Sequence, residues 1–186
     1  MAESKNNIVT YGLSGKVGNL LVFRNRAGKT VVSSAPRKST GEPSEAQKTH
    51  RRRFQEAVIY GREVNADPEK KELYAQSAKE GVSVYNVAVA DFMQAPDIIE
   101  INVNNYTGKT GDTITIMVKD DFMVFEVVVT IFNKDGTEVE SGNAQPADGY
   151  KWTYTVTSNN DNLNGDKIVV RAYDLPGNVN ANEKQL

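Results

Sequence analysis

Residues 97–186 contain five short segments in which apolar and polar residues alternate. Alternation with a period of two is typical of a β-strand with one buried and one exposed face. In residues 113–119, for example, Ile114, Ile116 and Val118 share one face. Strands are predicted at 98–103, 113–119, 125–132, 151–156 and 167–173, with turn residues between them. This pattern favours an antiparallel β-sandwich, in which two sheets bury a common core.

The end of the chain offers a poor last strand for such a sandwich. After the turn Asp174–Asn178 only Val179–Leu186 remains, with the sequence VNANEKQL and little apolar content on either face. A sandwich without a good last strand has an open edge, which can pair with a strand from another chain. We therefore expect association at this edge; the alternative is that VNANEKQL forms an ordinary polar edge strand of a monomer.

The region before the sandwich begins with a predicted β-hairpin. Asn19–Phe23 and Lys29–Ala35 are strand-like and flank Arg24–Gly28, a short loop ending in glycine that suits a hairpin. Glycines at positions 12, 15 and 18 precede it and permit positive φ or a close backbone approach.

Three short helices are predicted between residues 43 and 94. Ser44 and Gln47 have the spacing of a capping box. Asp67 is an N-cap residue followed by Pro68 at the first helical position, and Ser83 caps a third, largely apolar helix. The predicted fold is an α+β N-terminal module, residues 1–96, followed by an all-β immunoglobulin-like sandwich, residues 97–186.

Charge is distributed unevenly along the chain, although the overall net charge is only −2. Residues 1–66 contain 12 Lys and Arg against 5 Asp and Glu, whereas residues 98–186 contain 7 against 13. A basic front and an acidic back suit either binding of a polyanion or head-to-tail contact between copies. Self-contact is preferred because it needs no further partner.

Composition excludes several classes of chemistry. The chain has no cysteine and a single histidine, His50, which excludes disulfides, zinc–thiolate sites, cysteine nucleophiles and histidine-based triads. The segment GLSGKVGN differs from a phosphate-binding loop because Lys16 is followed by Val17 and a predicted strand, not by Ser or Thr and a helix. We therefore predict a protein that is not an enzyme and has no cofactor, catalytic residue, metal or small-molecule substrate.

Charged side chains provide two alternatives to this interpretation. Cations of the front half would contact a polyanion such as nucleic acid; they are Arg24, Arg26, Lys29, Arg51, Arg52 and Arg53. Consecutive arginines 51–53 span about 200° of a helix, so they cannot all face one groove. Asp120, Asp121, Asp174 and Asn178 lie at predicted loops and offer the oxygen ligands that Ca²⁺ prefers, although tight turns require the same residue types.

Two stretches resemble known families. The front half, with GKVGN, SAP and the S-x-x-Q-x-x-x-R-x-x-F pattern of residues 44–54, resembles uncharacterised bacterial and phage-like proteins. The back half, with GDTITIMVKDD and AYDLPGN, resembles the bacterial immunoglobulin-like domains of surface and virion proteins. The resemblance implies a fold and a structural setting, and it implies no activity.

The sequence therefore predicts a structural subunit that self-associates into an oligomer or filament, in a bacterial surface or virion-like assembly. Strand donation or head-to-tail docking would join the copies. The expected contact residues are apolar and close to the N-terminus: Ile8, Val9, Tyr11, Leu13, Leu20, Leu21, Val22 and Phe23. A nucleic-acid-binding protein and a monomeric immunoglobulin-like adhesion module are the alternatives. We expect a soluble chain with neither a membrane span nor a signal peptide.

Overall fold

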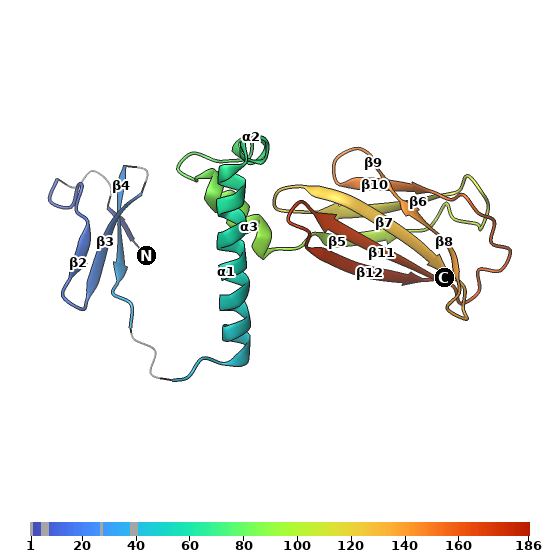
Figure 1. Ribbon diagram of the computed structural model, residues 1–186, viewed down its shortest axis with the longest axis horizontal. Coiled ribbons are helices and arrows are strands. Elements are labelled where there is room, and N and C mark those ends of the chain that lie inside the picture. The colour runs from blue at the N-terminus through green and yellow to red at the C-terminus, as the bar shows by residue number, and fades with distance from the viewer. Residues whose placement is uncertain (1, 5–7, 27, 38–40) are drawn as a thin grey trace.

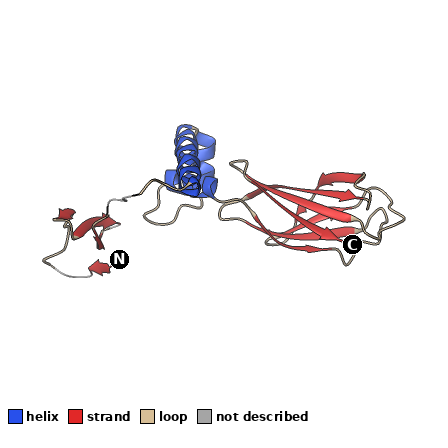
Figure 2. Cartoon of the chain, turned by 90° about the horizontal axis from the view of Figure 1, so that it is seen from below, coloured by secondary structure: helices blue, strands red, loops and turns tan. Residues whose placement is uncertain are grey.

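The computed structural model describes residues 2–4, 8–26, 28–37 and 41–186. The described chain is a mixed α/β structure of three antiparallel sheets and three helices. A small sheet comes first, the helices follow, and two further sheets complete the chain (Figure 1). Figure 2 shows the same sequence of elements from below, with the small sheet standing apart from the helices.

The first sheet has the strand order β1-β4-β3-β2. Its strands are β1 (Ala2–Ser4), β2 (Gly15–Val17), β3 (Leu21–Arg26) and β4 (Lys29–Ser34). The predicted hairpin is confirmed, but its turn is tighter than expected, because Arg24 to Arg26 continue β3 and Arg26 pairs with Lys29. Gly15 begins the second strand and Gly18 directly follows it, with φ of 115° and 55°, where a residue without a Cβ is favoured.

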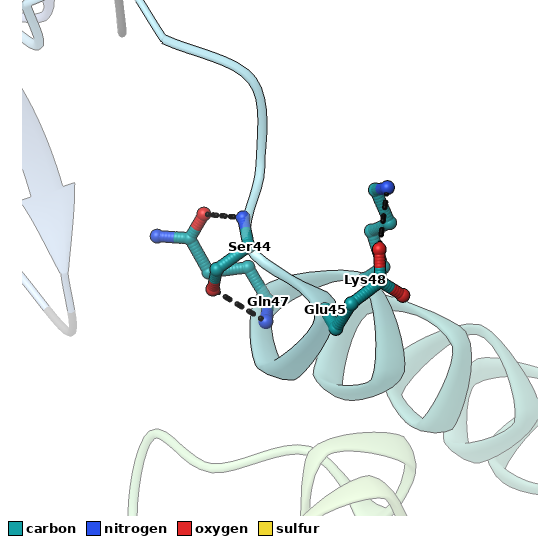
Figure 3. A network of polar contacts seen from close by, with 4 residues as sticks. All are labelled: Ser44, Glu45, Gln47 and Lys48. Atoms are coloured by element: carbon teal, nitrogen blue, oxygen red, sulfur yellow. Dashed lines mark hydrogen bonds and ion pairs between the residues drawn. The ribbon is translucent and has the colours of Figure 1, made fainter.

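The helices begin at the predicted caps. They are α1 (Glu45–Ala66), α2 (Pro68–Ala75) and α3 (Val84–Met93), so the first is much longer than the short helix expected. Figure 3 shows the capping box: Ser44 Oγ accepts from Gln47 N, and Gln47 Oε1 accepts from Ser44 N. Asp67 caps α2 and Ser83 caps α3, as predicted. A stripe of Ala57, Gly61 and Val64 is buried on α1, and α1 packs mainly on α3.

The remaining sheets enclose one hydrophobic core. One sheet has the order β5-β6-β10-β9 and the other β12-β11-β7-β8. Their strands are β5 (Asp97–Asn102), β6 (Thr113–Lys119), β7 (Val124–Phe132), β8 (Glu138–Asn143), β9 (Gln145–Pro146), β10 (Lys151–Thr155), β11 (Lys167–Asp174) and β12 (Val179–Gln185). Ile114 and Ile116 of β6 face the same cluster as Val129 of β7 and Ile168 of β11. The five predicted strands are confirmed to within one or two residues.

The expectation that the last strand is too poor to close the sandwich is wrong. All seven residues of β12 pair antiparallel with β11, from Val179↔Tyr173 to Gln185↔Lys167. The strand is polar because it lies at the edge of its sheet, where most of its side chains face water. Backbone pairing, together with the bond from Asn180 Nδ2 to Pro96 O at 2.9 Å, holds it without an apolar face.

Candidate functional site

An aromatic cluster joins the helices to the loops of the sandwich. Tyr74 of α2 is fully buried and stacks on Phe122, which lies between β6 and β7, with ring centroids 4.2 Å apart. Tyr60 of α1 meets Tyr74 edge to face and also contacts Phe92 of α3. Leu175, which follows β11, packs against the same cluster. Three helices and two sandwich loops therefore share this small core.

Asn178 connects the same parts through hydrogen bonds. It follows the turn after β11, and its Nδ2 donates to the carbonyl oxygens of Phe92 and Gln94 at 3.1 and 2.8 Å. Its Oδ1 accepts from Arg53 Nη2 of α1 at 2.9 Å. Its backbone N and its Nδ2 each donate to Asp174 at 2.6 Å. One side chain thus ties the C-terminal end of α3 and the middle of α1 to the sandwich.

Three carboxylates converge beside this junction. They are Asp91 of α3, Asp120 directly after β6, and Asp174 at the end of β11. One carboxylate oxygen from each lies within 4.8 Å of the other two. Asp91 and Asp174 are buried and Asp120 is half-buried. This is the group of acidic residues, in the described part of the chain, whose geometry suits a metal ion.

Each of the three carboxylates accepts at least one hydrogen bond from a neighbouring group. Tyr74 Oη donates to Asp91 Oδ2, while Asp91 Oδ1 is buried without a hydrogen-bond partner. Asp120 Oδ2 accepts from Met123 N at 3.0 Å. Asp174 has both oxygens engaged by Asn178. The two ion pairs found in the described residues, Lys48–Glu45 and Lys167–Glu183, lie elsewhere, so no ion pair with Lys or Arg neutralises the three acids.

Burial and the closeness of like charges raise the pKa values of the three acids. Burial raises the pKa of Asp91 to about 7, the bond from Tyr74 opposes this rise, and the nearby charge of Asp120 adds to it. Burial also raises the pKa values of Asp120 and Asp174. The pKa of the Tyr74 hydroxyl is strongly raised by burial and by its bond to Asp91, so it stays a proton donor. The site therefore holds excess negative charge that a proton or a cation must offset.

The sequence identified two of these three acids. Asp120 and Asp174 were expected at loop ends of the sandwich together with Asp121 and Asn178, and the structure brings both into the cluster. Asp121 is exposed and lies outside the group of three. Asp91 was missed, although one signal was present: it is the single charged residue of α3, VYNVAVADFM. A lone acid in an apolar helix is seldom buried without a specific role.

The predicted assembly residues lie in the first sheet and in the segments that connect its strands. Ile8 to Gly12 form turns and not the expected strand, and Leu13 follows them. Leu20 is exposed, while Leu21, Val22 and Phe23 belong to β3, which pairs with β2 and β4 on its two sides. Neither segment is an unpaired strand available for donation. Ile8, Tyr11 and Leu20 are each more than three-quarters exposed.

The predicted polyanion contacts do not form one surface. Arg24, Arg26 and Lys29 are exposed on the β3–β4 hairpin, and Arg51 and Arg52 are exposed on α1. Arg53 points the other way and donates to Phe92 O and Asn178 Oδ1 at 3.4 and 2.9 Å. The nucleic-acid alternative stays a prediction, with Arg53 engaged inside the molecule.

Comparison with known proteins adds little. No family model and no curated protein matches the chain. Among solved structures, the chain is similar to the solution NMR structure of a lipoprotein from Bacteroides thetaiotaomicron, with 15% identity over 48% of this chain and 75% of that chain and a TM-score of 0.24. A likeness at this TM-score establishes neither a shared fold nor a shared function. No helix in the described residues is long and apolar enough to cross a membrane.

Proposed function

We propose that this protein is a non-enzymatic structural subunit that associates with further copies of itself through its first sheet and the turns around it. The observation that carries the proposal is the exposure of apolar side chains there. Ile8 is 93% exposed, Tyr11 78%, Leu20 77% and Val17 59%. Several large apolar side chains exposed on one small sheet and its connecting turns are typical of an interaction site.

The first sheet has very little core of its own. Among its described side chains, residues 8–26 and 28–37, Val31 is the single buried apolar residue, beside the buried Thr30. A small sheet needs an apolar face packed against another element for independent stability. Burying Ile8, Tyr11 and Leu20 in a contact between copies would contribute roughly 1.5–3 kcal/mol for each side chain before entropy costs. A second copy of the chain would supply the missing packing.

Charge supports the choice of a second copy as the partner. Residues 1–66 carry a net charge of +7 and residues 98–186 a net charge of −6, from 12 against 5 and 7 against 13 charged residues. Docking of the basic front of one copy on the acidic back of the next is therefore electrostatically favourable and weakens with salt. Repetition of such a head-to-tail contact builds a chain of subunits unless the rotation closes a ring.

The two C-terminal sheets fit an immunoglobulin-like module in this role. With the two-residue β9 set aside, the first, second and fifth strands form one sheet, and the third, fourth, sixth and seventh form the other. Immunoglobulin-like sandwiches likewise place the first, second and fifth strands in one sheet and the third, sixth and seventh in the other, although the constant type has its fourth strand in the first of these sheets. Many cell-surface domains share this sandwich architecture.

Light scattering coupled to size-exclusion chromatography tests the proposal. The full chain should give a molar mass above the 20.5 kDa of one copy, and the mass should fall at high salt. Replacing Ile8 and Leu20 with Ser should reduce the mass, because both side chains are exposed and the change leaves the sheet's own packing intact.

Phe125→Ser is the matched control, since Phe125 is 61% exposed but lies on the sandwich. This control should associate as the unchanged chain does. A monomer at every salt and concentration tested, or an equal loss of association in the control, would refute association through the first sheet.

A further inference from the structure

We propose that Asp91, Asp120 and Asp174 together bind one Ca²⁺ ion at the junction between the helices and the sandwich. The proposal is independent of self-association, because the three residues lie far along the chain from the first sheet. It assigns a ligand to the acidic cluster and a role to the junction that the cluster occupies.

The three acids converge from separate elements of the fold. The three acids come from α3, from the loop after β6 and from the end of β11, yet one oxygen of each lies within 4.8 Å of the others. Oxygens that coordinate one calcium ion at 2.3–2.6 Å stand at separations of this order. Like charges at such distances repel strongly in a partly buried site, so the folded chain would not gather them without compensation.

One member of the cluster, Asp91, has a buried carboxylate oxygen without a hydrogen-bond partner among the described residues. Asp91 is only 1% exposed, and its Oδ1 has no hydrogen-bond donor in the described part of the chain. Its other oxygen is oriented by the Tyr74 hydroxyl, so the carboxylate is held in place. A buried carboxylate oxygen without a partner is rare and costly, and a bound cation removes that cost.

The neighbouring cation, Arg53, does not neutralise the three acids. Arg53 is directed at Asn178 Oδ1 and Phe92 O, and it forms no ion pair with the acids. Its role is to hold Asn178, which in turn engages both oxygens of Asp174. Lone pairs of Asp174 that Asn178 does not use remain available, as a carboxylate has about four acceptor positions. The surrounding hydrogen bonds thus orient the acids without neutralising them.

The chemistry of the ligands selects the class of ion. Three carboxylates, with no histidine or cysteine, form a hard oxygen site that suits Ca²⁺ or Mg²⁺ rather than zinc or copper. Ca²⁺ is favoured because it accepts irregular sets of six to eight oxygens, including bidentate carboxylates and water, whereas Mg²⁺ demands a nearly ideal octahedron. Ligands from a helix, a loop and the end of a strand are unlike such an octahedral cage.

The ion would have a route into the site. A surface pocket is lined by Asp91 and Asp121 together with Phe122 and residues of α3. A second pocket, on the sandwich side of the same loop, is lined by Asp120, Phe122 and Met123. Both pockets flank residues 120–123, and each is also lined by a lysine, Lys79 in the first and Lys151 in the second. Either pocket would bring an ion next to one of the three acids, Asp91 in the first and Asp120 in the second.

A bound ion would lock the helices to the sandwich. It would connect α3 to two sandwich loops that the chain otherwise joins through Asn178 and the aromatic cluster. The orientation of the helices relative to the sandwich would then depend on the calcium concentration. This function of the site is structural and needs no reaction.

Isothermal titration calorimetry of CaCl₂ into the full chain, first treated with EDTA and then dialysed, tests the proposal. We expect one ion per chain and a rise in Tm on adding 5 mM CaCl₂. Asp91→Asn should weaken binding at least tenfold and abolish the rise in Tm, while keeping an acceptor for the Tyr74 hydroxyl. Asp120→Asn gives the same test with a half-buried residue, in case the first variant folds poorly.

Asp148→Asn is the matched control, because it removes the same charge from an exposed position in the turn before β10. Binding by this variant should equal that of the unchanged chain. Absence of binding heat and of any shift in Tm at 5 mM CaCl₂ would overturn the proposal. Equal loss of binding in Asp148→Asn would also overturn it, since the effect would then be one of net charge. An equal response to MgCl₂ would overturn the assignment to calcium.

Discussion

Arg53 and Asn178, separated by 125 positions in the sequence, share a hydrogen bond of 2.9 Å between Nη2 and Oδ1. The bond joins the middle of the longest helix to the turn that precedes the last strand. Asn178 simultaneously donates to the carbonyl oxygens that end α3. Because Arg53 also donates to Phe92 O, the two side chains form one network around the end of that helix.

Asn178→Ala should destabilise the folded chain by about 2–3 kcal/mol, measured as the free energy of unfolding in urea. The change removes donors from the carbonyls of α3 and from Asp174, and it leaves Arg53 without its side-chain acceptor. Asn182→Ala is the control, because Asn182 is exposed on β12. Its side-chain Oδ1 accepts a hydrogen bond from the next backbone N, that of Glu183. A loss below about 0.5 kcal/mol in Asn178→Ala would contradict the network.

Gly61→Ala should also destabilise the chain, although alanine is the better helix former. A Cβ at this position would lie 2.8 Å from Val89 Cγ2 and 2.9 Å from Tyr85 Cδ2, so α1 and α3 would have to separate. Overpacking of this kind costs about 1–3 kcal/mol, against a gain of up to about 1 kcal/mol in helix propensity. Gly41→Ala, where the Cβ meets open space, should be close to neutral. Equal Tm values for the two variants would show that the helices tolerate the extra methyl group.

Gly108→Ala and Gly111→Ala separate steric contact from backbone strain. Both glycines have positive φ, +86° and +94°, so each substitution carries a similar conformational cost of about 1 kcal/mol. Only at Gly108 would the Cβ also meet a neighbour, the carbonyl oxygen of Asn160, at 2.2 Å. The Tm of Gly108→Ala should therefore be markedly the lower of the two. Similar Tm values would mean that the loop holding Asn160 moves freely.

The stability of the calcium-free chain should fall as pH rises from 5 to 8. The pKa of Asp91 is raised by burial from 3.8 to about 7, so the folded state holds a proton that the unfolded state has released in this window. Stability from this group is therefore greatest at the acid end and is lost by pH 8, by roughly 2.5 kcal/mol. Urea unfolding in EDTA at the two pH values measures the difference.

Asp91→Asn should flatten this pH dependence, because the side chain no longer titrates. Asp148→Asn should keep it, since that position is exposed. A slope of the same size in Asp91→Asn would assign the effect to another group.

Local patterns predicted the elements well. Alternation located the strands because a half-buried strand has a period of two regardless of its partners. The caps of α1, α2 and α3 were predicted because a capping hydrogen bond spans only three residues. The last strand was misjudged for the opposite reason: VNANEKQL has no apolar pattern, and its stability comes from backbone pairing with β11 at a sheet edge.

The amino-acid sequence by itself determined where the three helices and the five predicted sandwich strands begin, the absence of cysteine chemistry and the opposed charges of the two halves. These properties depend on neighbouring residues or on simple counts. Only the tertiary structure decided that Asp91 meets Asp120 and Asp174, that Arg53 turns inward to Asn178, and that the apolar residues around the first sheet stay exposed. Such contacts join segments from tens of residues to more than a hundred apart, and their geometry depends on how whole elements pack.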